Sequence, residues 1–335
     1  MVVCDRAQTA AALDFHELVE AVAQAAGEYA RGDIVSPERM VVPMGPAGGV
    51  LLSMPAVAHD IGIHKLVNVQ PANAARQLPT IHGIVTVCDA VTGRPLCLLD
   101  GPEVTGRRTA AVSLLAIKTL LPSAPTEVLL IGTGTQAAYH VQALHALHPG
   151  CTVWVRGSSR ARADAFCHAN RAAHDKLLAC DAAQVPAGAQ VVITLTTATS
   201  PVYDEPARAG CLVIGVGAFK PEMAELGALT LDGSDIYADD PAGARHEAGD
   251  LLRAGVDWAR VGSLASALAR KREMKPPRSS LRVSLPPEGA LSVFGRPGAT
   301  DTGRPIVFKS VGTGAWDLAA SRVALRHLAS SPLGA

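Results

Sequence analysis

The segment that decides the fold reads VLLIGTGTQAAYHVQAL and spans residues 128–144. Its apolar run over residues 128–131 predicts a strand that is covered on both faces, and the Ala-rich stretch after the glycines predicts a helix. Gly132, Gly134 and Ala137 supply the GxGxxA pattern at this junction. Gly132 permits a tight turn, Gly134 leaves room for a pyrophosphate, and the helix N-terminus offers unpaired N–H groups to phosphates. The segment therefore predicts a dinucleotide-binding site formed by Gly132, Thr133, Gly134, Thr135, Gln136 and Ala137.

Strand and helix patterns alternate along the chain after this segment. A helical pattern covers residues 160–174, and apolar runs that are typical of buried strands cover residues 153–156, 191–197, 211–217 and 235–239. Such alternation is typical of consecutive βαβ units. We therefore predict an α/β fold with a Rossmann-type, doubly wound parallel sheet over residues 116–309.

The first third of the chain has a different pattern. A helical period over residues 13–29 precedes short β-type runs over residues 39–43, 49–55, 64–69, 83–89 and 96–99. The Thr-Gly pair within residues 89–95 predicts a hairpin turn. A long helix is expected from Thr105 to residue 121, just before Pro122. These features predict a separate α+β domain over residues 1–115.

The remaining C-terminal part has two kinds of sequence. Residues 271–303 are rich in Pro, Gly and Ser, which predicts irregular structure. A strand beginning at Ile306 and a helix over residues 316–328 are expected to follow.

Composition excludes several classes of protein. A length of 335 residues fits about two domains, since a domain has roughly 150 residues. Charged residues make up 18% of the chain, and Lys+Arg equals Asp+Glu at 30 each, so neither disorder nor nucleic-acid binding is expected. Asp5 and Asp14 interrupt the first apolar stretch, and no later run reaches about 18 apolar residues without a charge or Pro. We expect a cytoplasmic protein with no membrane partner and a small molecule as its ligand.

The metal-binding residue types are dispersed. Seven cysteines and eleven histidines show neither CxxC nor HExxH spacing. We therefore expect free, mostly buried thiols and no metal.

The choice of dinucleotide depends on the end of the second strand of the sheet. An NAD enzyme usually has an acidic residue there for the ribose 2′-hydroxyl, whereas this chain reads VWVRGSSRAR over residues 153–162. Arg156, Ser158, Ser159 and Arg160 could bind a 2′-phosphate. The pattern favours NADP(H), with NAD(H) as the alternative cofactor, although a solvated loop would have similar residues.

Hydroxyl side chains end the fourth strand of the predicted sheet. Thr194, Thr196 and Thr197 are placed to line the nicotinamide side of the crevice. Thr is also an ordinary strand residue, so this alternative stays open.

Cations in apolar surroundings point to a substrate site in the first domain. Arg39, Lys65, and Arg107 with Arg108 stand among apolar residues. An isolated buried cation is costly, so such groups are paired or bind an anion. A carboxylate ligand satisfies them, while a surface position or a structural salt bridge is the alternative for each one alone.

The order of short motifs along the chain resembles the ornithine cyclodeaminase/mu-crystallin family. The motifs are R-x-V-x-P at 39–43, M-P at 54–55, K-x-V-N-x-x-P at 65–71, D-A-x-T-G-x-P at 89–95, R-T-A-A-x-S at 108–113, GxGxQA at 132–137, and FKSVG at 308–312 followed by Asp317. The resemblance implies that Arg39, Lys65 and Arg108 bind a substrate carboxylate. It also implies a homodimer built through the first domain, with the chain end returning there. That domain is then a substrate-binding and dimerisation domain of residues 1–115, completed by 310–335, beside an NADP(H)-binding domain of residues 116–309.

One departure from the family pattern narrows the expected reaction. Phe219 stands where the cyclodeaminases and alanine dehydrogenases of the family have an Asp, and Glu222 and Glu225 are weaker substitutes. The chain is more similar to the ketimine reductases of the family. This similarity implies NADPH-dependent reduction of 1-pyrroline-2-carboxylate and 1-piperideine-2-carboxylate to proline and pipecolate.

The residues expected to act on the imine follow from this resemblance. Lys65 is the catalytic candidate, since it could donate to the reacting nitrogen, with His82 and Asp317 as weaker candidates for proton transfer. Met54 and Phe219 would wall a small pocket suited to a cyclic imino acid. The alternatives are a linear-imine dehydrogenase of opine or siderophore type, an ornithine cyclodeaminase, and a non-catalytic crystallin-like binding protein.

Overall fold

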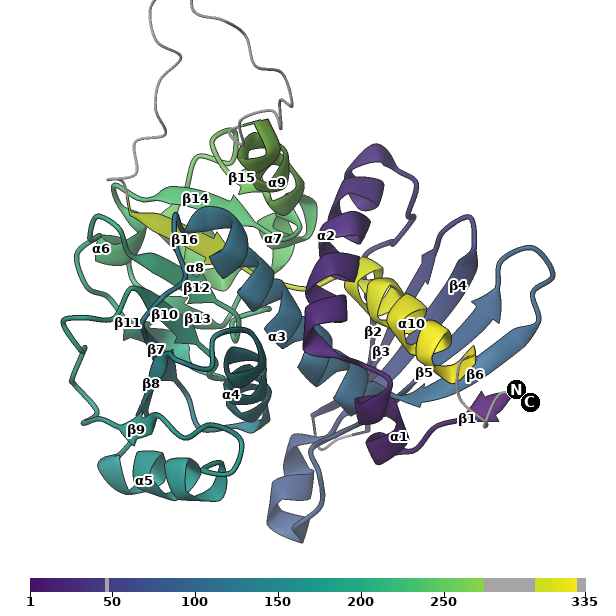
Figure 1. Ribbon diagram of the computed structural model, residues 1–335, viewed down its shortest axis with the longest axis horizontal. Coiled ribbons are helices and arrows are strands. Elements are labelled where there is room, and N and C mark those ends of the chain that lie inside the picture. Colours follow the sequence, from purple (N-terminus) through teal and green to yellow (C-terminus); the bar gives the residue numbers. More distant parts are fainter. Residues whose placement is uncertain (46–47, 274–304, 330–335) are drawn as a thin grey trace, which may run out of the picture.

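The structure is a computed structural model, and it describes residues 1–45, 48–273 and 305–329 (Figure 1). Two main sheets lie on opposite sides of the long helix α3 (Gly101–Leu120). Most of the Pro- and Gly-rich stretch over residues 271–303 lies outside the described residues.

The larger sheet has eight strands, and all of their pairings are parallel. The order across the sheet is β15-β14-β16-β12-β10-β7-β8-β9, so the chain runs outward in both directions from β7 and β10. This order confirms the predicted doubly wound sheet, whose binding crevice lies where the winding reverses. The strands are β7 (Glu127–Ile131), β8 (Thr152–Arg156), β9 (Leu177–Ala179), β10 (Val191–Thr194), β12 (Leu212–Gly215), β14 (Asp235–Ala238), β15 (Gly262–Ser263) and β16 (Ile306–Lys309).

Both faces of this sheet are covered, as the apolar strand sequences predict. Val128 and Leu130 of β7 pack into one apolar core, and Leu129 and Ile131 pack into another. Alternate side chains of a strand point to opposite faces, so these cores lie on the two sides of the sheet. The helices of this part are α4 (Thr135–Leu147), α5 (Arg160–Ala169), α6 (Ala228–Leu231), α7 (Pro241–Glu247), α8 (Gly249–Ala254) and α9 (Leu264–Glu273).

The smaller main sheet has the order β1-β6-β5-β4-β3-β2 and is antiparallel except for the β1–β6 pair. Helix α10 (Gly314–Ala329) lies along β3 and β4 and packs beside α2 (Phe15–Arg31) (Figure 1). The predicted hairpin turn forms at Asp89, whose carboxylate accepts from the backbone N–H of Thr92 at 2.7 Å. The remaining elements are β1 (Val2–Val3), α1 (Arg6–Ala11), β2 (Met40–Met44), β3 (Gly49–Val57), β4 (Ile61–Val69), the 3-10 helix η1 (Pro71–Arg76), β5 (Ile81–Asp89) and β6 (Pro95–Asp100).

Several elements differ from the sequence prediction. Helix α3 begins four residues before Thr105, because Asp100 caps it by accepting from the backbone N–H of Glu103 at 2.8 Å. Helix α5 ends at Ala169 rather than at residue 174. The short strands β9 and β15, and the pair β11 (Thr199–Tyr203) with β13 (Ala224–Leu226), were not predicted, because periodicity over two to five residues is too weak a signal.

Strand β16 and helix α10 connect the two halves of the molecule. The strand lies inside the parallel sheet, and the helix lies on the antiparallel one (Figure 1). Residues 310–313 make the crossing and are buried. The chain therefore passes between the two sheets at the position where the candidate site is found.

Two further expectations can be compared with the structure. All seven cysteines are free and most are buried, as predicted. Within the described ranges, we find no helix with the length and apolar character that a membrane crossing requires.

Candidate active site

Three buried charged side chains meet beneath the antiparallel sheet. Lys65 takes its place in the row of β4 side chains that is otherwise apolar and buried, and it faces Asp317 in the first turn of α10. Lys65 Nζ lies 2.5 Å from Asp317 Oδ2, and Arg108 Nε of α3 donates to Asp317 Oδ1 at 3.1 Å. Lys65 and Asp317 are 2% and 0% exposed, so neither charge is hydrated by bulk water. Asp317 thus brings together Lys65 and Arg108, two of the residues predicted to bind a substrate carboxylate.

The electrostatics of this cluster leave it with excess positive charge. Burial lowers the pKa of Lys65 to about 8, since the charge of Asp317 only partly offsets the loss of water and Arg108 adds repulsion. Burial alone would raise the pKa of Asp317, but the charges of Lys65 and Arg108 hold it below its usual range. Asp317 is therefore a fixed anion at neutral pH, and an additional anion would stabilise the two cations.

Arg39 reaches the same region from the segment before β2. Its Nη2 atom donates to Glu247 Oε2 at 2.7 Å and to the carbonyl oxygens of Val311 and Gly312 at 2.9 Å each. The cation lies 5.9 Å from the ring centroid of Phe219. Arg39 thus joins the antiparallel half of the molecule to helix α7 of the parallel half.

The crossing segment is held by one buried acid that follows β14. Asp239 accepts from Ser310 Oγ at 2.8 Å and from the backbone N–H groups of Val311 and Gly312 at 2.9 and 3.0 Å. Gly312 has a φ of +80°, and a Cβ there would lie 3.0 Å from Arg108 Nη1. The crossing segment therefore lies against both Arg39 and Arg108 and holds the two side chains in fixed positions relative to each other.

The GxGxxA turn has the geometry that a dinucleotide needs. Gly132 has a φ of +131°, and a Cβ there would lie 2.6 Å from the carbonyl oxygen of Leu195. Gly134 is the N-cap of α4 without a side-chain cap, and a Cβ there would meet no atom within 4 Å. The free N–H groups of α4 therefore face open space, which fits a pyrophosphate. Thr133 and Gln136 of the predicted set are half-buried in this turn, Thr135 is exposed, and Ala137 is buried.

The predicted 2′-phosphate contacts are brought together only in part. Ser158, Ser159 and Arg160 are exposed after β8, and Ser159 Oγ caps α5 by accepting from the backbone N–H of Arg162 at 3.3 Å. Arg160 pairs with Asp164 at 3.0 Å on the same helix. Arg156 differs from the expectation. It is only 7% exposed, and its guanidinium donates to the carbonyl oxygen of Val202 in β11, so the fold itself engages this cation.

The three threonines predicted near the nicotinamide have different surroundings, and Thr197 is exposed. Thr194 is buried, and its hydroxyl has no hydrogen-bond partner among the described residues. Thr196 donates to Glu225 Oε1 through both its backbone N–H and its hydroxyl. The other Glu225 oxygen accepts from the backbone N–H groups of Gly217 and Ala218 at 2.6 and 3.1 Å. Glu225 thus ties together the two loops that follow β10 and β12.

Met54 lies beside the charged cluster, whereas His82 lies outside it. Met54 is buried and pairs with Lys65 across β3 and β4. His82 is exposed on β5 opposite Asn68, an odd number of residues from Lys65 along β4, and therefore points to the other face of the sheet. Glu247 could not be identified from the sequence, because its partner Arg39 is 208 residues away in the chain.

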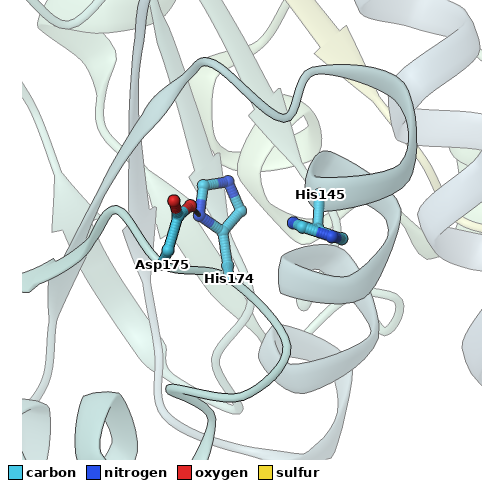
Figure 2. A group of neighbouring side chains, drawn as sticks. All are labelled: His145, His174 and Asp175. Carbon is cyan, nitrogen blue, oxygen red and sulfur yellow. Dashed lines mark ion pairs between the residues drawn. The ribbon is translucent and has the colours of Figure 1, made fainter.

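One group of possible metal ligands is found among the described residues. His145 of α4 lies beside His174 and Asp175, with the candidate ligand atoms within 4.8 Å of one another (Figure 2). His174 Nδ1 accepts from the backbone N–H of Lys176 at 3.1 Å, so its other nitrogen carries the proton. This tautomer has no spare lone pair for a metal, and the edge-to-face contact of the two rings at 5.6 Å gives the group a packing role. We assign no metal to it.

The fold and this geometry define a nicotinamide-dependent oxidoreductase, and sequence comparison gives its family. The profile of the ornithine cyclodeaminase/mu-crystallin family matches residues 1–331. The chain belongs to this family, as the resemblance in its motifs predicted, and is an NAD(P)H-dependent oxidoreductase.

Curated relatives match almost the whole chain. Delta(1)-pyrroline-2-carboxylate reductase 1 of Burkholderia multivorans is 50% identical over 328 residues, covering 98% of this chain and 96% of its own. Delta(1)-pyrroline-2-carboxylate/Delta(1)-piperideine-2-carboxylate reductase of Azospirillum brasilense is 50% identical over 332 residues, covering 99% and 97%. Both relatives are named as reductases of cyclic imino carboxylates.

Solved structures share the fold at lower identity. The Delta(1)-pyrroline-2-carboxylate reductase of Thermococcus litoralis, in complex with NADH and L-proline, superposes with a TM-score of 0.82 at 23% identity and covers 98% of both chains. An archaeal alanine dehydrogenase dimer with bound NAD has a TM-score of 0.79 at 22% identity, covering 98% of this chain and 96% of that one. These likenesses confirm the predicted two-part architecture.

Proposed function

We propose that the protein reduces cyclic ketimine carboxylates, namely 1-pyrroline-2-carboxylate and 1-piperideine-2-carboxylate, to proline and pipecolate with NADPH. The observation that carries this proposal is the buried cluster of Lys65, Arg108 and Asp317 with Arg39 beside it. Three cations face two acids, Asp317 and Glu247, when both acids are ionised. One positive charge is left over, and two when Glu247 is neutral, so the site stabilises a substrate carboxylate. The names of the curated relatives support the same substrates.

The cations have donors available for such a substrate. Arg108 uses Nε for Asp317, and Arg39 uses Nη2 for its three acceptors. We propose that the other guanidinium N–H groups of both residues hold the substrate carboxylate. Fixing this group orients the ring and removes rotational freedom before the reaction.

Lys65 is proposed to act on the imine nitrogen. Asp317 holds the ammonium in place, and the lowered pKa of Lys65, about 8, makes its proton easier to donate than that of an exposed lysine. The chemistry that the cofactor supplies when bound is a hydride for the C=N carbon. Hydride addition at carbon and one proton at nitrogen convert the imine to the amine, so no further group has to leave.

A nicotinamide dinucleotide fits the turn between β7 and α4, and we propose NADP(H) as the preferred form. Gly132, Gly134 and the free N–H groups of α4 would hold the pyrophosphate. Ser158, Ser159 and Arg160 would contact the 2′-phosphate, since all three are exposed. No acidic residue is present between Val153 and Arg162 to bind a ribose hydroxyl instead.

We also propose a homodimer in which residues 1–115 with 310–335 form the substrate-binding and dimerisation domain, and residues 116–309 form the nucleotide-binding domain. The face of the antiparallel sheet away from α10 carries Met40, Val42 and Ile84, which are 63%, 41% and 43% exposed. Exposed apolar side chains gathered on one sheet face mark an interaction surface, and a second copy would cover them. Sedimentation of the purified protein tests this assembly.

The proposed carboxylate site is tested by paired substitutions on one helix. Arg108→Ala should raise the KM for 1-pyrroline-2-carboxylate about 10-fold or more, because a charge-assisted hydrogen bond contributes about 1.5–3 kcal/mol. Arg107→Ala is the control, since Arg107 binds Glu103 at 2.8 Å and stacks on Phe15 instead of facing Asp317. An unchanged KM in Arg108→Ala would remove this residue from the site.

A further inference from the structure

Arg39 and Glu247 form an ion pair that a carboxylate substrate would disturb. Their Nη2 and Oε2 atoms are 2.7 Å apart, and the side chains are only 13% and 20% exposed. The bonds of Arg39 to the carbonyl groups of Val311 and Gly312 also use Nη2. Among the described residues, no hydrogen bond involves Arg39 Nε or Nη1, so this edge of the guanidinium can accept an anion.

A substrate carboxylate on that edge would place two carboxylates on one guanidinium. Two carboxylates that share one site repel each other, and the pair is stabilised when one of them takes up a proton. The substrate carboxylate is a stronger acid than the Glu247 carboxylate. The positive charges of Arg39, Arg108 and Lys65 surround the substrate position and stabilise the ionised form of the substrate carboxylate. Among the described residues, the hydrogen bond and the ion pair of Glu247 are both with Arg39.

We infer that Glu247 takes up a proton when a carboxylate ligand binds to Arg39, and that it releases this proton when the ligand leaves. The inference rests on the proposed function, in which Arg39 is a ligand of the substrate carboxylate. Glu247 of α7 is then a positioning residue whose protonation changes the net charge of the site when a ligand binds. The proton comes from the solvent, since the Glu247 side chain is 20% exposed.

Neighbouring acids are less suited to this role because their oxygens are already engaged. Asp239 accepts five hydrogen bonds, from Ser310 Oγ, the Trp316 indole and the backbone N–H groups of Asp240, Val311 and Gly312. Asp240 caps α7 and faces the hydroxyl of Tyr29 at 3.3 Å. Glu247 has a single hydrogen bond, from Arg39, and its Oε1 atom has none among the described residues.

The surroundings of Glu247 place its pKa near neutral pH, where a change in nearby charge can change its protonation. Burial, together with the charges of Asp239 and Asp240, raises the pKa of Glu247 to about 7, although the positive charge of Arg39 opposes this rise. Glu247 is therefore about half ionised in the free protein at pH 7. A bound carboxylate adds another negative charge nearby and raises the pKa again.

The test is calorimetric titration of the protein saturated with NADP⁺, using pyrrole-2-carboxylate as a planar ligand that cannot be reduced. Its ring nitrogen does not titrate near neutral pH, so proton exchange reports on the protein. Titrations at pH 7 in buffers of different ionisation enthalpy give the protons taken up per site. The wild-type protein should take up about 0.5 proton, and Glu247→Gln should take up about 0.1 or less, the remainder arising from Lys65.

Two controls separate the inference from the function on which it rests. Glu17→Gln removes an acid that pairs with His327 at 2.8 Å at the far end of α10, and it should keep the wild-type uptake. The wild-type Kd should also be about tenfold weaker at pH 8 than at pH 6, which needs no substitution. Equal uptake in the wild type and Glu247→Gln, or none in either, would overturn the role of Glu247 and leave the function intact. If the ligand fails to bind to the wild type at all, the carboxylate site itself is wrong.

Discussion

Asp317 Oδ2 lies 2.5 Å from Lys65 Nζ inside the protein, and Asp317 Oδ1 accepts from Arg108. A strand, a long helix and the C-terminal helix therefore meet at one carboxylate. A buried acid with two cations is costly to assemble, and the arrangement still leaves positive charge. We propose that Asp317 positions the two cations for a ligand, since it neutralises only one of their two charges.

The first prediction concerns this acid. Asp317→Asn should lower the free energy of unfolding by about 3–5 kcal/mol, because Lys65 and Arg108 would become unpaired buried cations. It should also reduce kcat/KM strongly, since Lys65 would lose its proton at neutral pH. Urea unfolding and steady-state kinetics measure the two effects. Wild-type stability in the Asn variant would show that the ion pairs contribute little.

The second prediction concerns pH. Protonated Lys65 attracts the substrate carboxylate, and its pKa is about 8, so the KM for the imine should rise as the pH increases above 8. Lys65→Arg stays charged at these pH values and should lose this rise. The effect on stability has the opposite direction. The unfolded chain binds more protons than the folded one between pH 8 and the usual 10.5, so the contribution of Lys65 to stability increases with pH there. A KM that is flat to pH 10 in the wild type would contradict the assignment.

The third prediction concerns the choice of dinucleotide. Ser159→Asp keeps a good N-cap for α5 but places a negative charge beside the expected 2′-phosphate. The KM for NADPH should rise about 10-fold or more, while the KM for NADH stays the same or falls. Ser159→Asn, which caps without charge, is the matched control. If both variants behave alike toward the two cofactors, the 2′-phosphate lies elsewhere.

The fourth prediction separates the two glycines of the turn. Gly134→Ala should leave the melting temperature unchanged, because a Cβ there meets no atom within 4 Å, and should weaken cofactor binding by occupying the pyrophosphate space. Gly132→Ala should destabilise the fold itself, since a Cβ would lie 2.6 Å from Leu195 O at a φ of +131°. Thermal unfolding with and without NADPH measures both. Tight cofactor binding by Gly134→Ala would argue against this pyrophosphate position.

Sequence reasoning predicted the parts of the fold and site that have local signals. The apolar run before Gly132 and the spacing of later apolar runs predicted the parallel sheet. Lys65 is a cation among apolar residues in the sequence, and the structure places it in the buried face of β4. The family resemblance groups Arg39, Lys65 and Arg108. The structure brings Lys65 and Arg108 together at Asp317, and Arg39 and Arg108 to the crossing segment.

The remaining features depend on contacts between distant residues. Arg156 was expected in the phosphate site, but its guanidinium binds Val202 on a short strand that has no clear sequence pattern. Glu247 lies in a short polar helix, and its contact with Arg39 arises only when the two halves of the molecule pack together. Periodicity describes single elements, so it could not predict either contact.

The central claim is tested most directly by following NADPH oxidation with 1-pyrroline-2-carboxylate and 1-piperideine-2-carboxylate. Pyruvate with methylamine would serve as a linear-imine control, and L-ornithine with NAD⁺ as a cyclodeaminase control. The proposed function predicts turnover of both cyclic imines, faster than of the linear imine, and none of ornithine. Tight NADPH binding without oxidation by either cyclic imine, or faster turnover of the linear imine, would contradict it.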